Sequence, residues 1–327
     1  MTPTSASPRG WPAEVQAVTH RAGLDNSEQP CLIYDPRDSQ PVPLLVALHT
    51  WSNDHLQPEP FYAEWCLVKR WAMIRPNFRG PNRTPEACGS ELAVHDILSA
   101  VTFARTTMKI DLNRIYLVGV SGGGHMALLM AGRAPEIWAG VSAWCGIHDL
   151  AAWHSQQKKT MSNTYWKALE AVCGGAPGSS PAADDQYRQR SPATWLKRAT
   201  GLPIDIAAGI ADGHNGSVPV SHSLNAFNDL AADTDRISDT QIDALTVRPS
   251  VPSELQRPAA DPLYGAKPIL YRRQSRQARV TLFAGGHEII PSAALNWLSG
   301  QRKGSPANWN PAAPLTASAG PAVESGK

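Results

Sequence analysis

Short apolar stretches alternate with amphipathic stretches along most of the chain. The apolar runs, rich in β-branched residues and flanked by Gly or Pro, predict strands at 31–36, 43–50, 71–78, 115–120, 138–145, 203–210 and 279–286. Apolar residues at helical spacing predict helices at 90–108, 123–134, 220–232 and 291–300. Alternating strands and helices are typical of βαβ units, so the pattern predicts an α/β fold with a mostly parallel central sheet and helices on both faces.

Two segments interrupt this alternation. Residues 148–200 are more polar than their surroundings, and residues 233–275 are rich in Pro, Asp and Ser. We interpret the first as a cap-like insertion and the second as an excursion, both within one domain that covers 1–303. The tail 304–327 has a low-complexity Pro/Ala/Ser composition and is expected to be disordered.

The composition favours a globular protein and gives no indication of a nucleic-acid-binding or membrane protein. The 327 residues are 42% hydrophobic and 18% charged with a formal net charge of +2, as expected of a globular chain. This balance does not indicate a nucleic-acid partner, and the basic run 271–279 is interpreted as a solvated face. No run approaches the roughly 18 to 20 apolar residues of a spanning helix, so no membrane partner is expected. Residues 1–16 lack the apolar core of a secretory signal, which leaves a cytoplasmic protein or an exported one with its signal removed.

The five cysteines are spread along the chain without a CxxC pair or a Cys/His cluster, so no zinc site is predicted. Their odd number leaves at least one thiol free within a single chain. A disulfide, for instance between Cys88 and Cys173, remains open, as does the oligomeric state.

The segment Gly119-Val120-Ser121-Gly122-Gly123 follows an apolar strand, opens a predicted helix and matches G-x-S-x-G. The glycines permit a tight turn that holds the serine in a strained conformation with its hydroxyl exposed. N–H groups at the start of the helix would face negative charge developing beside that hydroxyl. The motif predicts a nucleophile. The alternative is a capping serine in a turn, so a base and an acid are required.

A nucleophilic serine needs a histidine to accept its proton and an acid to orient that histidine. In this type of sheet both follow the serine, on loops after later strands. Of ten histidines, His287 leaves the last predicted strand through two glycines, just before the C-terminal helix. Asp212 follows the strand 203–210, whereas Asp205 would lie inside it. The segment HEII lacks the second histidine of a zinc-protease motif. We therefore predict a triad of Ser121, Asp212 and His287.

The segments LHTWSND, NFRGPN, GVSGGG, GIADGHNGSVPVSHS and AGGHEI together resemble the catalytic domain of the prolyl oligopeptidase family of α/β-hydrolases, with related single-domain acetyl xylan and feruloyl esterases. The resemblance covers roughly residues 30–300. It implies the α/β-hydrolase fold, with Ser121 as nucleophile, His287 as general base and then acid, and Asp212 as its orienting acid. It implies no metal and no organic cofactor.

The oxyanion hole departs from the pattern of many relatives, which carry His-Gly-x after the third strand and use the N–H of x. This chain has His49-Thr50-Trp51 there. We expect the backbone N–H groups of Gly122 and Trp51 to be the oxyanion donors. Thr50 lacks the conformational freedom of glycine, so this loop need not follow the path that it takes in the relatives.

Eleven tryptophans are many for a chain of this length. The indole of Trp51 is expected to wall the acyl or leaving-group pocket. Trp153 and Trp166, in the insertion, are candidate platforms for a sugar ring or an aromatic acyl group. The alternative for all three is ordinary packing.

These features predict a serine hydrolase that cleaves carboxylic esters, of small molecules or linked to polysaccharide, through an acyl-enzyme. Large peptidases of the resembled family place another sizeable domain ahead of the hydrolase domain. Only a short segment precedes the core here, which favours an esterase. The alternatives are a prolyl oligopeptidase-like serine peptidase and a non-catalytic binding protein that keeps the fold.

Overall fold

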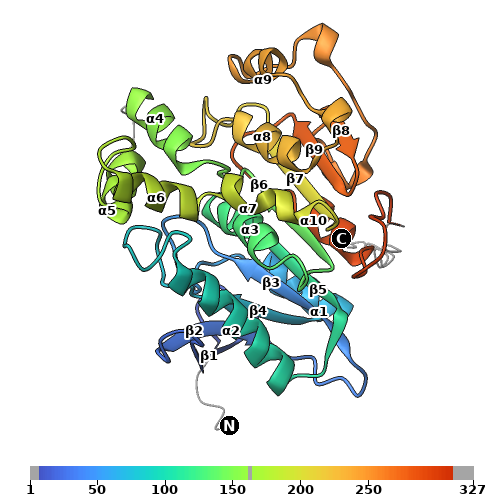
Figure 1. Ribbon diagram of the computed structural model, residues 1–327. Coiled ribbons are helices and arrows are strands. Elements are labelled where there is room, and N and C mark those ends of the chain that lie inside the picture. Colours follow the sequence, from blue (N-terminus) through green and yellow to red (C-terminus); the bar gives the residue numbers. More distant parts are fainter. Residues whose placement is uncertain (1–6, 161–163, 312–327) are drawn as a thin grey trace, which may run out of the picture.

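The computed structural model describes residues 7–160 and 164–311. A nine-stranded sheet runs through the described residues in the order β1-β2-β4-β3-β5-β6-β7-β9-β8 (Figure 1). From β4 through β3, β5, β6 and β7 to β9 the pairs are parallel, and β1, β2 and β8 join antiparallel at the two sides. The predicted mostly parallel sheet is confirmed. The strands are β1 (Gln16–Arg21), β2 (Glu28–Tyr34), β3 (Val42–Leu48), β4 (Ala72–Pro76), β5 (Ile110–Val120), β6 (Gly140–Trp144), β7 (Ile204–Gly209), β8 (Ile269–Ser275) and β9 (Ala278–Phe283).

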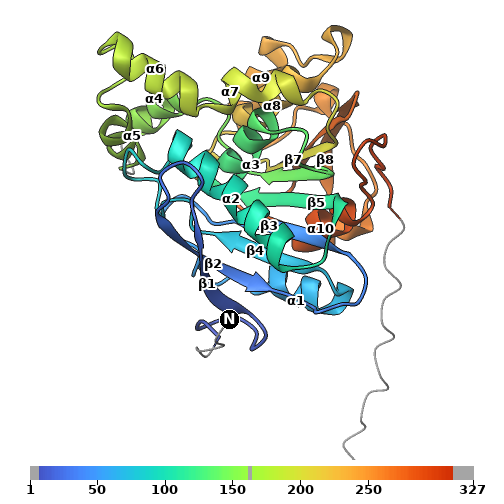
Figure 2. The same ribbon diagram turned by 60° about the horizontal axis from the view of Figure 1, so that its bottom comes forward.

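Helices cover both faces of the sheet, as predicted. The helices α2, α3 and α8 pack on one face, and α1 and α10 pack on the other (Figures 1 and 2). Their bounds are α1 (Phe61–Lys69), α2 (Glu91–Thr107), α3 (Gly122–Arg133), α8 (Ser221–Leu230) and α10 (Pro291–Ser299). None of the described helices combines the length and the hydropathy needed to span a bilayer.

The central strands are buried on both sides, which explains why the sequence pattern revealed them. All seven residues of β3 are buried, as are the five of β4. The edge strand β1 exposes four of its six residues, so it lacks the apolar run that marks a buried strand. Neither β1 nor the other edge strand, β8, was predicted from the sequence, and α1 was also missed.

The insertion 148–200 is helical, with α4 (Leu150–Thr160), α5 (Tyr165–Cys173), α6 (Pro181–Arg190), α7 (Pro192–Trp195) and the 3-10 turn η1 (Leu196–Ala199). Helices α4 to α6 gather at one side of the molecule in both views (Figures 1 and 2). They share a second hydrophobic cluster with Trp51, separate from the main core. Arg190 ties α6 to the segment before α2, because its guanidinium donates to the carbonyls of Pro85 and Ala87 at 2.8 Å each.

Both cysteines of the candidate disulfide, Cys88 and Cys173, lie buried in this second cluster as free thiols. The excursion 233–275 carries α9 (Asp239–Thr246) and three 3-10 turns before β8, η2 (Asp233–Asp235), η3 (Ser253–Leu255) and η4 (Pro262–Tyr264).

The basic run 271–279 is not entirely a solvated face, in contrast to its interpretation from sequence. Arg279 is 2% exposed, because its guanidinium pairs with the buried carboxylate of Asp205 through two N–O contacts of 2.8 Å. Trp309 covers the guanidinium, with its ring centroid 5.2 Å away. Of the predicted tail, residues 304–311 are described, and 312–327 lie outside the described residues.

Candidate active site

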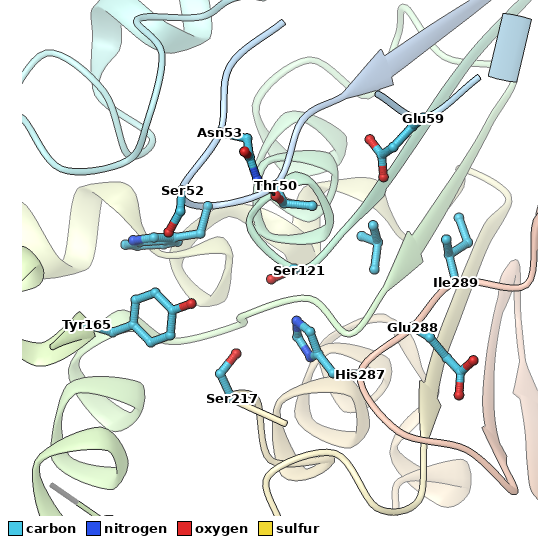
Figure 3. A pocket seen from close by; sticks show the side chains of 12 residues that line it. Thr50, Ser52, Asn53, Glu59, Ser121, Tyr165, Ser217, His287, Glu288 and Ile289 are labelled. Carbon is cyan, nitrogen blue, oxygen red and sulfur yellow. Dashed lines mark hydrogen bonds between the residues drawn. The ribbon is translucent and has the colours of Figure 1, made fainter. Parts of the chain in front are cut away.

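Ser121 lies at the junction of β5 and α3, with φ 59° and ψ −122°. This positive φ is rare for a residue with a side chain. The turn is tight because a Cβ on Gly119 would lie 2.3 Å from the carbonyl of Gly123, and a Cβ on Gly123 would lie 2.6 Å from the carbonyl oxygen of Leu48. The N–H of Ser121 donates to the carbonyl of Trp144 at 2.8 Å. These contacts hold the turn so that the hydroxyl faces a cavity (Figure 3).

Asp212 and His287 come from the loops that follow the neighbouring strands β7 and β9. The two loops touch at Gly209, where a Cβ would lie 2.3 Å from the carbonyl carbon of Gly285 and from the carbonyl oxygen of Gly286. Nδ1 of His287 lies 2.8 Å from Oδ2 of Asp212. The structure thus places the side chains of these two predicted site residues in hydrogen-bond contact.

The Asp212 carboxylate is held on its other side as well. Its side chain is fully buried, and Oδ1 accepts N–H groups of Gly213 at 2.9 Å and Val218 at 3.1 Å. A Cβ on Gly216 would lie 2.3 Å from the same oxygen, so the loop wraps closely over the carboxylate. Oδ2 therefore stays directed at His287. That side chain is 23% exposed, and Figure 3 shows its imidazole facing the hydroxyl of Ser121 across the cavity.

The backbones of Gly122 and Trp51 meet beside Ser121. A Cβ on Gly122 would lie 2.4 Å from the backbone nitrogen of Trp51 and 2.5 Å from its Cα. Neither N–H donates to another described residue. The backbone reaches this place without a left-handed Thr50, whose φ is not positive. Two unpaired N–H groups side by side can stabilise an oxyanion.

The side chains of Gln57 and His49 hold the loop that contains Thr50 in place. Oε1 of Gln57 accepts the N–H of Thr50 at 2.9 Å and its hydroxyl at 3.1 Å. The ring of His49 lies between the carbonyl oxygens of Asn77, at 2.8 Å, and Thr50, at 3.0 Å. It also stacks on Phe78 with centroids 3.8 Å apart. Burial lowers the pKa of His49 to about 4, so the ring is neutral at pH 7 and donates from one nitrogen only.

A cavity of about 430 Å³ opens in front of Ser121 and His287 (Figure 3). This volume lies within the range of small-molecule sites. Both polar and apolar side chains line it. The lining residues are Thr50, Trp51, Ser52, Asn53, Glu59, Val120, Ser121, Tyr165, Ser217, His287, Glu288 and Ile289.

Of the three candidate tryptophans, Trp51 lines this cavity and the other two do not. Trp51 is 2% exposed, so its indole belongs mainly to the wall. Trp153 lies behind it, with ring centroids 4.8 Å apart, and donates its Nε1–H to the carbonyl of Ser217 at 2.7 Å. Trp166 lies elsewhere on the insertion, with the ammonium groups of Lys158 and Lys167 about 5 Å from its ring. Trp153 therefore supports the cavity wall from outside.

Sequence reasoning missed several cavity residues, among them Glu59, Tyr165 and Ser217. Ser217 follows Asp212 by five positions, so its place on the same loop was a usable signal. Glu59 precedes α1 and Tyr165 begins α5, and neither segment carries a motif that links it to Ser121. Only tertiary packing brings them to the cavity.

One group of described residues brings together three metal-ligand types, namely Cys145, Asp212 and His287, with ligand atoms within 4.8 Å of one another. The carboxylate is already used by the imidazole and by two backbone N–H groups. Burial raises the pKa of the Cys145 thiol well above its usual value, which favours the protonated form over a metal-binding thiolate. The donor set fits an acid–imidazole pair better than a metal centre.

A model of the prolyl oligopeptidase family matches residues 90–245, which include Ser121 and Asp212. No curated protein matches the chain. Among solved structures, the chain is similar to apo prolyl oligopeptidase B from Galerina marginata, with a TM-score of 0.54 and 18% identity over 66% of this chain and 31% of that one. It is also similar to the uncomplexed acylaminoacyl peptidase of Pyrococcus horikoshii, with a TM-score of 0.51 and 19% identity over 66% and 34%.

A puromycin-hydrolyzing peptidase of Mycobacterium tuberculosis gives a TM-score of 0.52 and 17% identity over 68% of this chain and 34% of that one. This chain thus spans about a third of the length of these structures. At such identities the likeness shows the fold, and the matched family model agrees with it. The chain therefore has the α/β-hydrolase fold, and its residues 90–245 match the prolyl oligopeptidase family.

Proposed function

We propose that the protein is a serine hydrolase that cleaves carboxylic esters, with Ser121 as nucleophile, His287 as general base and acid, and Asp212 as the residue that orients the imidazole. The observation that carries the proposal is the hydrogen bond of 2.8 Å between His287 Nδ1 and Asp212 Oδ2, beside a strained serine that faces the same cavity. The hydrogen bond to Asp212 leaves Nε2 of the neutral ring as the basic nitrogen.

The reaction proceeds in two steps through an acyl-enzyme. As the hydroxyl oxygen of Ser121 attacks the ester carbonyl, its proton passes to Nε2 of His287, and the N–H groups of Trp51 and Gly122 stabilise the oxyanion. The tetrahedral intermediate then expels the alcohol, which takes the proton from Nε2. Water, deprotonated by the same nitrogen, releases the acid and restores the serine.

The form of the cavity supports an ester with small groups. Its volume is about 430 Å³, and Trp51, Tyr165 and Ile289 are among its walls. Its two carboxylates are each paired with a base, Glu59 with Arg75 and Glu288 with Lys267, both at 2.5 Å. A compact cavity with neutralised charges suits an uncharged acyl ester better than a peptide with charged ends.

The matched family model supports a second candidate, a prolyl oligopeptidase-like serine peptidase. The two are separated by measuring kcat/KM for p-nitrophenyl acetate and for a dipeptide p-nitroanilide, each divided by its uncatalysed rate. We expect the larger ratio for the ester. The esterase activity should be lost in Ser121→Ala. The matched control is Ser253→Ala, at an exposed serine in the excursion, which should keep the activity. A larger ratio for the anilide would favour the peptidase, and activity in Ser121→Ala would refute the mechanism.

A further inference from the structure

Glu59 presents to the cavity a carboxylate oxygen that has no hydrogen-bond partner among the described residues. Glu59 is 9% exposed, and its Oε2 pairs with Nη2 of Arg75 at 2.5 Å. Its Oε1 accepts no hydrogen bond from any described residue and is not among the fully buried atoms. Figure 3 shows the carboxylate at the cavity on the side of Thr50 and Ile289, away from Tyr165. The free oxygen is therefore open to whatever enters the cavity.

The buried guanidinium of Arg75 already compensates the negative charge of Glu59. The side chain of Arg75 is fully buried, with the rings of Trp11 and Tyr62 within 6 Å of its guanidinium carbon, and its Nε and Nη1 have no acceptor in the described part of the chain. A cationic ligand group at Oε1 would be repelled by this buried guanidinium, which water cannot screen. A neutral hydrogen-bond donor meets the same acceptor without that penalty.

A second hydrogen-bonding group, the hydroxyl of Ser217, also lines the cavity. The carbonyl of Ser217 accepts N–H groups from Trp153 at 2.7 Å and Gln157 at 2.6 Å, which fixes the loop. Its hydroxyl has no partner among the described residues, lines the cavity and is drawn beside His287 in Figure 3. The cavity thus offers hydrogen-bonding groups on both sides of Ser121.

Building on the proposed function, we propose that the ester substrate carries a free hydroxyl group close to the ester, as in a partly acylated polyol or sugar, and that this hydroxyl donates to Oε1 of Glu59. Glu59 is then a specificity-determining residue. A hydrogen bond to a charged acceptor in a buried site changes kcat/KM by about tenfold to a hundredfold.

The test uses two pairs of esters that differ by one hydroxyl, each corrected for its uncatalysed rate. Glyceryl monoacetate is compared with propyl acetate for the alcohol side, and p-nitrophenyl 3-hydroxybutyrate with p-nitrophenyl butyrate for the acyl side. We expect the wild-type protein to favour the hydroxylated member of at least one pair by about tenfold or more. No preference in either pair, or a faster reaction of the matching 3-aminobutyrate ester, would overturn the inference.

The variant Glu59→Gln should reduce the preference, because its amide oxygen remains with Arg75 and the substrate hydroxyl then meets a neutral NH₂ group in place of the charged acceptor. Glu64→Gln, the same change at an exposed position on α1, should retain it. If the loss of the Arg75 partner unfolds Glu59→Gln, Glu59→Asp keeps the charge but withdraws Oε1, and should also lose the preference. An unchanged preference in the folded variant would overturn the inference. If the wild-type protein hydrolyses none of these esters, that result would instead contradict the proposed function, on which the inference about Glu59 rests.

Discussion

A methyl group at Gly122 tests the oxyanion hole directly. In the variant Gly122→Ala the new Cβ would lie 2.4 Å from the backbone nitrogen of Trp51 and 2.5 Å from its Cα. Ordinary Cβ contacts begin near 3.4 Å, so the two backbones must separate by about 1 Å. The contacted atoms belong to the backbone, which Gln57 and His49 hold in place, so a side-chain rotation cannot relieve the clash.

The expected loss follows from this displacement. Removing one oxyanion donor lowers kcat by about 10²- to 10³-fold, or roughly 3 to 4 kcal/mol, and a displacement of ~1 Å has a similar effect. The donors act on charge that develops in the transition state, so KM should change little. Overpacking should also lower the free energy of unfolding by about 1 to 3 kcal/mol.

The assay is steady-state hydrolysis of p-nitrophenyl acetate, with the folded fraction checked by thermal melting. Gly201→Ala is the matched control, because a Cβ there meets nothing within 4 Å and its φ is not positive. It should keep the wild-type kcat. A folded Gly122→Ala protein with the wild-type kcat would show that the N–H groups of Gly122 and Trp51 do not stabilise the reaction.

Three further changes have defined outcomes. Asp212→Asn should lower kcat by about 10³- to 10⁴-fold at pH 7 under the proposed mechanism, since the amide no longer fixes the tautomer of the His287 imidazole, and stopped-flow acylation rates would reveal the loss. Asp205→Ala leaves Arg279 buried without a counter-charge and should lower the free energy of unfolding in urea by about 3 to 5 kcal/mol. Burial lowers the pKa of His125 to about 4 and that of His222 to about 3, so both are neutral when folded and gain a proton on unfolding below pH 6.5. Stability is therefore full above pH 6.5 and falls as the pH drops towards 4, by about 2 kcal/mol for each histidine at pH 5. Urea unfolding of His125→Asn should show a correspondingly smaller loss between pH 7 and 5.

The sequence pattern revealed elements that are buried and missed those that are not. The central strand β3 is apolar at every position, so its place in the sheet was predictable. Most residues of the edge strand β1 are exposed, so no buried apolar pattern marks it. It is recognised as a strand through its pairing with β2. The helix α1 was missed although Tyr62, Ala63 and Cys66 are buried against the sheet.

Individual side chains follow the same rule: those marked by local sequence context were predictable, and those placed by tertiary contacts were not. Ser121, Asp212 and His287 follow strands in a set chain order, so local context was enough to propose them. Arg279 is charged and lies in a basic run, and only the three-dimensional position of Asp205 explains why it is buried. Glu59 reaches the cavity because Arg75, on the neighbouring β4, holds it there. Tertiary contacts between charged side chains produce no periodic pattern in the sequence, so they could not be predicted from it.

The central claim is that Ser121 is a nucleophile activated by His287. Intact-mass analysis and peptide mapping after treatment with a fluorophosphonate test it most directly. We predict one adduct, on Ser121, which is lost in the folded variant His287→Ala and is prevented by prior incubation with an ester substrate. A folded wild-type protein that forms no adduct on Ser121 would contradict the claim, and the serine would then be a turn residue only.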